Sequence, residues 1–332
     1  MTPPLDARTQ PTHANLGTAA VGDRIDGTFF VSESDLKPAR DGRPYWRVRL
    51  LDEHGGSLGA TMFDFVGEPP AVGSVVELAG VVDRYGGGRV LRVERYRCLD
   101  GEAAEAWLPR VRVDRAELVD QLEAAIAQVV DPHLRALLDH ILGDAETRER
   151  YLAAPAASKY HSARVGGLAM HSLAVRRLAL EAADALGGYP CDRDLLAVAA
   201  LLHDVGKIDE LELSLATGGE AKWTTIGQLH GHIVHGVRRI ERAAAAVGLP
   251  AALRDHLIHL IVSHHGQPSW GSPVVPMTPE AVALHVGDYA ASRIEAVLDA
   301  ADAAEPGGEW TGYNKMLEAR LYLGFRPDQA VP

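Results

Sequence analysis

The hydrophobic pattern of the chain changes near residue 100, and this change restricts the possible fold more than any other feature. Before residue 100 the apolar residues fall in short β-rich runs: GTFFV, YWRVRLLD, SLGATMFDF, SVVELAGVV and RVLRVERYR. Turn signals such as ARDGRP, DEHGG and RYGGG separate the runs. From about residue 112 the apolar residues recur at helical spacing instead. The sequence therefore predicts two parts of different structural class.

The five β-rich runs occupy roughly eighty residues, which is the strand number and size of a small closed barrel of the OB type. A different five-stranded barrel or sandwich fits the periodicity equally well. We place the barrel at residues 21–102, after a disordered tail over residues 1–20. OB-folds commonly bind oligonucleotides, and the aromatic residues of these strands are interleaved with arginines. We expect nucleic-acid contacts from Trp46, Arg47, Phe63 and Arg92, unless the aromatics are core and the arginines are a solvated face.

The helical part begins with Asp114 and Glu117, which are spaced as a capping box. Its apolar spacing predicts helices over residues 112–124, 132–142, 144–153, 163–186, 193–204, 226–247, 250–264, 278–300 and 312–322. We divide this part into a helical connector over 103–158 and a second domain over 159–332. The predicted class is α+β multidomain, with a five-stranded OB-type barrel followed by an all-α domain.

Composition narrows the class of protein further. The formal net charge of −12 argues against indiscriminate binding to nucleic acid, although a locally basic groove remains compatible with it. The two cysteines, Cys98 and Cys191, belong to no motif, and the N-terminus does not resemble a signal peptide. We expect a cytoplasmic protein with no membrane partner. A homo-oligomer is compatible with the sequence.

The histidines indicate where the chemistry lies, because 11 of the 15 fall between residues 161 and 285. Histidine is the commonest metal ligand in proteins. The apolar run LLAVAALL ends directly in His203 and Asp204, so an ionisable pair is carried on a segment that should be buried. Gly206 then supplies a helix stop, and Lys207 follows it. The pair is either a satisfied core ion pair or part of a site.

Further polar residues interrupt the apolar faces of the other predicted helices. Taken singly, each is more often a hydrogen-bonded residue than a ligand. Together they offer five imidazoles and two carboxylates: His171, His203, Asp204, His232, His264, His265 and Asp288. His235 shares a helix face with His232 and is an alternative ligand. This mixed set suits Mn, Fe, Co, Ni or Zn and is too large for one tetrahedral zinc. We expect two divalent metal ions bridged by one carboxylate, which is an arrangement suited to phosphoester hydrolysis.

The ordered set, with HDVGK at its centre, resembles the HD superfamily of metal-dependent phosphohydrolases over residues 161–288. The resemblance implies a first metal held by His171, His203, Asp204 and Asp288. It implies a second metal held by His232, His264 and His265, with Asp204 as the bridge. Lys207 would contact the substrate phosphate or stabilise the charge that develops in the transition state. Asp204 and Lys207 are thus the expected catalytic residues.

The stretches KYHSARVGGLAMHSLAV, GQLHGHIVHG and SHHGQPSWGSPVVPMTPEAVALHVGD resemble the bacterial exoribonucleases that join an OB-fold to an HD domain. This resemblance covers roughly residues 20–325 and implies a manganese-dependent 3′→5′ exonuclease for single-stranded RNA, sometimes DNA. It also implies that Lys159 and His161 assist phosphate binding. The chain departs from this family at Ala291, where members tend to carry a second Asp, and in a barrel that is less basic than an RNA groove requires.

The loop residue Trp270 lies between the expected ligand His265 and Gly271, so it would either stack on a terminal base or hold its own loop in place. Two other functions remain open at this point. One is an HD phosphodiesterase or nucleotidase for small nucleotides, with the barrel in a regulatory or oligomerisation role. The other is a non-catalytic adaptor that binds nucleic acid.

Overall fold

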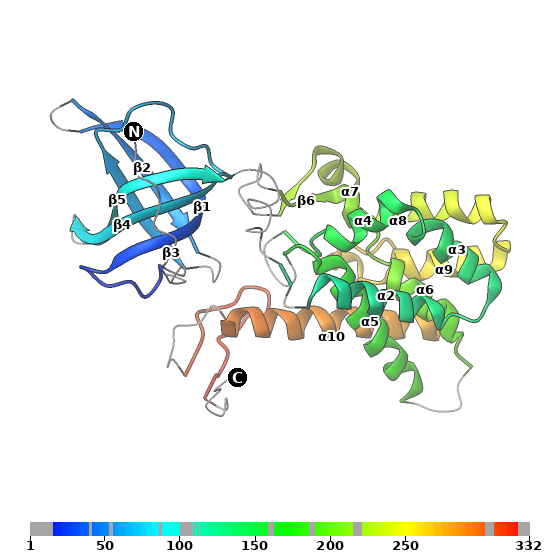
Figure 1. The fold of residues 1–332 in the computed structure, drawn as a ribbon. Helices are drawn as coiled ribbons and strands as arrows, with labels where there is room; N and C mark the ends of the chain where they lie inside the picture. Colours follow the sequence, from blue (N-terminus) through cyan, green and yellow to red (C-terminus); the bar gives the residue numbers. More distant parts are fainter. Residues whose placement is uncertain are drawn as a thin grey trace. The chain divides into compact units, whose positions relative to one another are not determined.

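The computed structural model describes residues 16–39, 42–52, 56–85, 88–99, 108, 110–111, 113–158, 163–185, 190–214, 221–302 and 309–324 (Figure 1). The chain forms two compact units, and the boundary between the β-rich unit and the helical unit falls after Pro109. The sequence placed this boundary at residue 102. Within the described residues, no helix is both long enough and apolar enough to cross a membrane.

The N-terminal unit is a closed five-stranded barrel. Its strands are β1 (Arg24–Pro38), β2 (Pro44–Leu51), β3 (Ser57–Phe63), β4 (Val75–Tyr85) and β5 (Gly88–Leu99). They close in the order β1-β2-β3-β5-β4, and β1 pairs with both β2 and β4. Every pairing is antiparallel except that of β3 with β5. The predicted OB-type barrel is therefore confirmed.

The barrel core reaches further toward the N-terminus than the sequence predicted. Leu16 is completely buried among the apolar residues of the barrel, and Ala19 is 5% exposed. The backbone N–H of Leu16 donates to Asp52 Oδ2 (2.7 Å), and the Arg89 guanidinium donates to the carbonyl of Gly17 (3.1 Å). These contacts fix the described part of the expected tail against the barrel. Residues 1–15 lie outside the described residues.

Strand alternation corrects one of the four expected nucleic-acid contacts. Successive side chains of β2 point to opposite faces, so Trp46 points into the core, whereas Arg47 points outward. The Trp46 side chain is completely buried, packs on Phe65 and Tyr96, and donates its indole N–H to Ser34 Oγ (2.9 Å). Trp46 therefore cannot stack on a base and stabilises the barrel instead.

The C-terminal unit consists of helices around one hydrophobic core. The core includes residues from the helices before residue 158, so these helices do not form a separate connector. The helices are α2 (Arg115–Ala127), α3 (Pro132–Leu142), α4 (Ala145–Ala153), α5 (Gly167–Asp184), α6 (Arg193–Leu202), α7 (Lys207–Glu210), α8 (Thr225–Val247), α9 (Ala251–Ser263) and α10 (Pro279–Asp302). Short pieces complete it: β6 (Leu211–Glu212), β7 (Lys222–Trp223) and the 3₁₀ turn η1 (Pro268–Trp270).

Helix α6 lies at the centre of this unit, because every residue from 195 to 202 is buried. It packs against α5, α9 and α10, and its C-terminus delivers the HDVGK sequence. Asp192 caps the N-terminus by accepting from the backbone N–H of Leu195 (2.9 Å). An apolar helix packed on all sides gives the residues that follow it a rigid support.

The expected helix over residues 312–322 is absent from the described structure. This segment instead forms isolated β-bridges between Trp310 and Tyr322 and between Asn314 and Ala319, around a turn. The Asn314 side chain accepts hydrogen bonds from the backbone N–H groups of Met316 and Leu317 (2.9 and 3.1 Å). An asparagine that satisfies the backbone in this way favours a turn over a helix.

Ion pairs join α7 to the helices beside it. Asp209 on α7 accepts from Arg150 of α4 (2.8 Å) and from Arg239 of α8 (2.9 Å). Burial would raise the pKa of Asp209, but hydrogen bonds from Arg239 and Arg150 lower it below the usual value. This carboxylate therefore holds three helices together while it is ionised.

We predict that Trp46→Ala destabilises the barrel by about 3–5 kcal/mol, because it removes a fully buried aromatic side chain. Phe63→Ala, which removes a half-exposed aromatic from the same barrel, should cost no more than about 0.5 kcal/mol. Hydrogen exchange of barrel peptides across a urea series measures both. Equal effects of the two substitutions would contradict the burial difference.

We predict that Asp209→Asn lowers the free energy of unfolding of the helical unit by about 1–3 kcal/mol at pH 7. Because its folded-state pKa lies below the unfolded value of about 3.9, Asp209 stabilises the fold fully above that value. Its contribution is lost as the pH falls through the folded-state pKa. The deficit of the variant should therefore be constant near neutrality and shrink below about pH 4.

Urea unfolding between pH 3 and pH 7 tests this prediction. Asp139→Asn is the matched control, since Asp139 also pairs with an arginine, Arg135, but at an exposed position. The control should cost no more than about 0.5 kcal/mol. A deficit at Asp209 that stays constant down to pH 3 would show that its charge is not the cause.

Candidate metal centre

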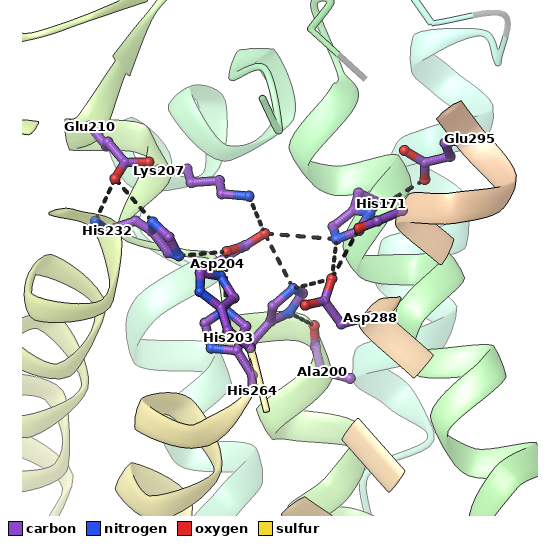
Figure 2. Close-up of polar contacts among 12 residues, drawn as sticks. His171, Ala200, His203, Asp204, Lys207, Glu210, His232, His264, Asp288 and Glu295 are labelled. Carbon is purple, nitrogen blue, oxygen red and sulfur yellow. Dashed lines mark hydrogen bonds and ion pairs between the residues drawn. The ribbon is translucent and has the colours of Figure 1, made fainter. Parts of the chain in front are cut away.

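The helical unit brings all seven candidate ligands into one buried cluster, most of which is drawn in Figure 2. The residues come from α5, from the turn after α6, from α8, from the turn after α9, and from α10. They form three overlapping groups whose donor atoms lie within 4.8 Å of one another: His232, His264 and His265; His171, His203 and Asp288; and His203, Asp204 and His264. Each of these groups could hold a metal ion.

The carboxylate of Asp204 lies between two of these groups and is 1% exposed. Its Oδ1 atom faces Nε2 of His232 (3.4 Å) and of His264 (3.7 Å). Its Oδ2 atom faces Nε2 of His203 (3.2 Å) and of His171 (3.8 Å). The two oxygens therefore face different sets of imidazoles, as a carboxylate shared by two cations would.

The Nδ1 atoms of the five imidazoles share one arrangement, in that each lies within hydrogen-bonding distance of an oxygen. The partners are the carbonyls of Ala200 for His203 (2.8 Å), Ile261 for His264 (2.6 Å) and Trp270 for His265 (2.8 Å), and the carboxylates of Glu295 for His171 (3.3 Å) and Glu210 for His232 (3.0 Å). A carbonyl can only accept, so Nδ1 carries the proton in at least three of the rings. This leaves Nε2 as the atom available to a metal.

Four buried polar atoms of the cluster make no hydrogen bond to any part of the chain that the structure describes. They are Nε2 of His203, His232 and His264, and Oδ1 of Asp204. Leaving a buried polar atom unpaired costs about 1–3 kcal/mol. A divalent cation would satisfy these atoms, so the residues fit a metal, and mixed N/O donors suit Mn, Fe, Co, Ni or Zn.

Lys207, the first residue of α7, places its ammonium beside the same carboxylate. Its Nζ lies 2.6 Å from Asp204 Oδ2, and its side chain is 14% exposed. Burial acts to lower the pKa of Lys207, but attraction to Asp204 raises it, so the amine stays charged. Burial acts to raise the pKa of Asp204, but Lys207 and His203 hold it well below its usual value. The carboxylate is thus ionised at neutral pH.

The two ends of the cluster differ in charge. Burial and the neighbouring imidazoles lower the pKa of His264 and of His265, so both rings are neutral donors at pH 7. Burial also acts against a charge on His171, but hydrogen bonds to Asp288 and Glu295 raise its pKa to about 10. In the metal-free protein the His171 ring is therefore protonated on both nitrogens and positively charged. A bound cation would displace one of these protons.

Two glycines set this geometry. A Cβ on Gly206 would lie 2.0 Å from the carbonyl oxygen of His232, so the glycine permits the close approach of α7 and α8. The sequence predicts a helix stop at Gly206. The structure instead ends α6 at Leu202 and places Gly206 directly before α7, with an ordinary φ of −68°. Gly231 has a φ of +72° inside α8 and kinks that helix one residue before His232. The kink directs the backbone N–H of His232 to Glu210 Oε1 (2.7 Å).

The remaining expected site residues have different positions. His235 is part of none of the metal-binding groups found among the described residues, and its ring lies 5.4 Å from that of His230. Trp270 is 47% exposed and its ring is stacked on Tyr289, with centroids 5.7 Å apart. Lys159 and His161 lie outside the described residues.

Trp270 and Tyr289 line a pocket of about 200 Å³ that also includes His265, Asp288 and Arg293. The pocket therefore adjoins the metal-binding cluster. The guanidinium of Arg293 lies 4.9 Å from the centre of the Tyr289 ring and donates to the carbonyl of Met316 (2.5 Å). A flat aromatic wall beside a cation suits a nucleotide.

Four residues of the site were not predicted from the sequence: Glu210, Glu295, Tyr289 and Arg293. The sequence contains a signal that could have identified Glu295, because this residue follows Asp288 by seven positions and so lies on the same face of a helix. The sequence contains no such signal for Glu210, since its contact with His232 depends on how α7 packs against α8. Tyr289 and Arg293 become relevant only when the C-terminal segment and the loop after α9 are placed beside α10.

The barrel carries a separate cavity of about 890 Å³, lined by Tyr45, Arg47, Phe63, Tyr85 and Arg92 among others. Phe63 is 51% exposed there. Arg47 pairs with Asp35 (2.6 Å), whereas Arg92 has no ion-pair partner among the described residues. Three of the four expected nucleic-acid contacts thus line one groove.

Comparison with known proteins places the chain in a family. The HD domain model matches residues 168–293, a range that contains all seven candidate ligands. The 3′-5′ exoribonuclease YhaM of Bacillus licheniformis is 30% identical over 309 residues, covering 91% of this chain and 95% of that protein. The chain belongs to the YhaM family of HD-domain proteins. The YhaM proteins of Bacillus velezensis and Bacillus subtilis are 30% and 29% identical, with the same coverage.

The YhaM alignments extend well beyond the HD domain, since they cover 91% of the chain. The HD domain match ends within α10, whereas the YhaM relatives also account for most of the remaining chain. The likeness to the YhaM family is therefore one of domain organisation and not of the HD domain alone. The similarity to the YhaM relatives therefore includes the barrel as well as the helical unit.

We predict that Glu210→Gln weakens binding of Mn²⁺ by about tenfold, because hydrogen-bonded partners of ligand histidines contribute at least this much to affinity. Glu210 holds both the ring and the backbone N–H of His232. Glu241→Gln is the control, since Glu241 lies exposed on the same helix. Equilibrium dialysis measures the affinity for Mn²⁺. Equal affinities of the two variants would show that Glu210 does not contribute to metal binding.

Proposed function

We propose that this YhaM-family protein is a metal-dependent 3′→5′ exonuclease that hydrolyses the phosphodiester bonds of single-stranded RNA, with single-stranded DNA as a second substrate. One observation carries the proposal: the Asp204 carboxylate lies between two histidine groups and beside the charged Lys207. The similarity to proteins named 3′-5′ exoribonucleases supports it. Because Cys98 and Cys191 belong to no motif, we place the protein in the cytoplasm.

We assign His171, His203, Asp204 and Asp288 to one divalent ion. We assign Asp204, His232, His264 and His265 to a second ion, so that Asp204 serves both. Manganese is our first choice, and Fe, Co, Ni and Zn are compatible with the same donors. When bound, two divalent ions would supply Lewis acidity to the phosphodiester and would lower the pKa of a bound water.

The chain itself supplies charge and position. Asp204 and Asp288 keep their carboxylates ionised, and His264 and His265 stay neutral, so the cluster is ready to hold cations at neutral pH. Lys207 is partly exposed and sits 2.6 Å from Asp204. From there its ammonium can turn to a phosphate oxygen and stabilise the negative charge that develops there.

The pocket beside the cluster is assigned to the 3′-terminal nucleotide. A base that stacks on Trp270 would gain about 1–3 kcal/mol. The carbonyl of Trp270 also accepts from His265 Nδ1, so substrate stacking and ligand orientation share one loop. We further assign Lys159 and His161 to phosphate binding on the strength of the family resemblance alone.

The barrel groove is assigned to the upstream part of the strand. Phe63 presents an exposed ring for base stacking, and Arg92 is available to a phosphate. Arg47 lines the same groove but must first leave Asp35. We therefore give Phe63 and Arg92 the larger share of RNA binding.

We predict that the purified protein with Mn²⁺ shortens a 5′-labelled single-stranded RNA stepwise from its 3′ end. Asp204→Asn should lose bound metal and activity together, because one carboxylate serves both ions. Asp255→Asn, an exposed substitution on α9, is the control and should retain both. Gel electrophoresis of the products and metal analysis of the proteins provide the measurements.

Two outcomes would overturn the proposal. Hydrolysis of free mononucleotides or cyclic nucleotides without shortening of RNA would indicate a small-nucleotide hydrolase. Retention of RNA binding by a metal-loaded protein that cleaves neither class of substrate would indicate an adaptor. A third outcome, retained activity in Asp204→Asn, would show that the mechanism does not need a carboxylate shared by both ions.

A further inference from the structure

The helical unit contains a second polar cavity, which none of the seven candidate metal ligands lines. It has a volume of about 480 Å³ and is bordered by the end of α3, the start of α4 and the middle of α8. Five basic residues line it: His140, His235, Arg238, Arg239 and Arg242. Such a concentration of basic groups is unexpected in a chain with a formal net charge of −12.

Four of these residues lie on one face of α8, because positions 235, 238, 239 and 242 follow helical spacing. Arg238 and Arg242 are four residues apart, and like charges at this spacing destabilise a helix. Glu241 lies between them in sequence, but neither arginine forms an ion pair with any described residue. The fold therefore tolerates a repulsion between two arginines that no direct ion pair in the described structure offsets.

The acidic groups of the cavity are already engaged. Asp209 is bonded to Arg239 and also to Arg150. Asp144 caps α4 by accepting from the backbone N–H of Thr147 (2.8 Å). Neither carboxylate forms an ion pair with Arg238 or Arg242.

Arg239 provides a second observation that points to a ligand. Its Nε atom is buried and has no hydrogen-bond partner within the described part of the chain. Its two terminal nitrogens, in contrast, are bonded to Asp209 (2.9 Å) and to Thr147 Oγ1 (3.4 Å). A buried N–H donor without an acceptor costs free energy, so this guanidinium is not fully satisfied by the chain. A small turn of the Arg239 side chain toward the cavity would give the donor an anion to bond.

We propose that this cavity is a second, non-catalytic site that binds phosphate groups. Guanidinium groups match phosphate oxygens through paired hydrogen bonds, and three of them converge here. The volume lies in the usual range for small-ligand sites and admits a nucleoside phosphate or a short piece of phosphodiester backbone. The site contains none of the assigned metal ligands, so it is independent of hydrolysis at the metal centre.

Isothermal titration of the metal-free protein with inorganic pyrophosphate, and separately with AMP, tests the proposal. We expect saturable binding of each ligand at this cavity, in addition to any AMP bound at the Trp270 pocket. The affinity at this cavity should fall at least about tenfold in the double variant Arg238→Ala/Arg242→Ala, whereas binding at the Trp270 pocket should not change. Both side chains are exposed, so the variant should fold, which circular dichroism and urea unfolding check. Arg177→Ala is the matched control, an exposed helical arginine with no ion pair among the described residues, and it should bind as the native protein does.

A third titration, with a single-stranded RNA 12-mer at several salt concentrations, identifies the source of the phosphate. Loss of pyrophosphate or AMP binding in the double variant supports a free phosphate ligand. If these do not bind, a weaker RNA affinity with a shallower salt dependence in the double variant supports strand phosphates. If no affinity differs between the double variant and Arg177→Ala, the proposal is wrong.

Discussion

The metal-binding cluster depends on one buried carboxylate. Asp204 sits at the end of a helix that is apolar on every face, where an ionised group is costly unless other charges offset it. The chain offsets it with Lys207 on one side and imidazoles on both. Each surrounding feature, from the kink at Gly231 to the close contact at Gly206, brings one of these partners within reach. The rest of the helical unit can be understood as the support for this arrangement.

Helix ends orient two of the imidazoles. His203 follows α6 and His264 follows α9, and each donates from Nδ1 to the carbonyl three residues earlier. The last carbonyls of a helix have no partner within the helix. These two ligands therefore satisfy their own helices with one nitrogen and present the other to the centre. Glu210 and Glu295 perform the same task where no helix end is available.

The parts of the molecule that follow a local rule were predictable from the sequence. Strand periodicity identified the barrel, and the ordered histidines identified the residues that meet at the cluster. Features that depend on packing were not predictable. The sequence pattern alone is compatible with Trp46 on the surface, and only the register of β2 places its side chain in the barrel core. Glu210 contacts His232 only because α7 packs against α8. The segment 312–322 has helical spacing, but the Asn314 side chain accepts from the backbone N–H groups of Met316 and Leu317 and so stabilises a turn.

The shortness of α7 restricts how such a chain can diverge. Within four residues it presents Lys207 to Asp204, Asp209 to two arginines, and Glu210 to His232. Inserting one residue would rotate everything after it by about 100° around the helix axis. No single compensating substitution could restore the contacts of all three residues. The length of this turn should therefore be maintained through evolution as strictly as the residues that make these contacts.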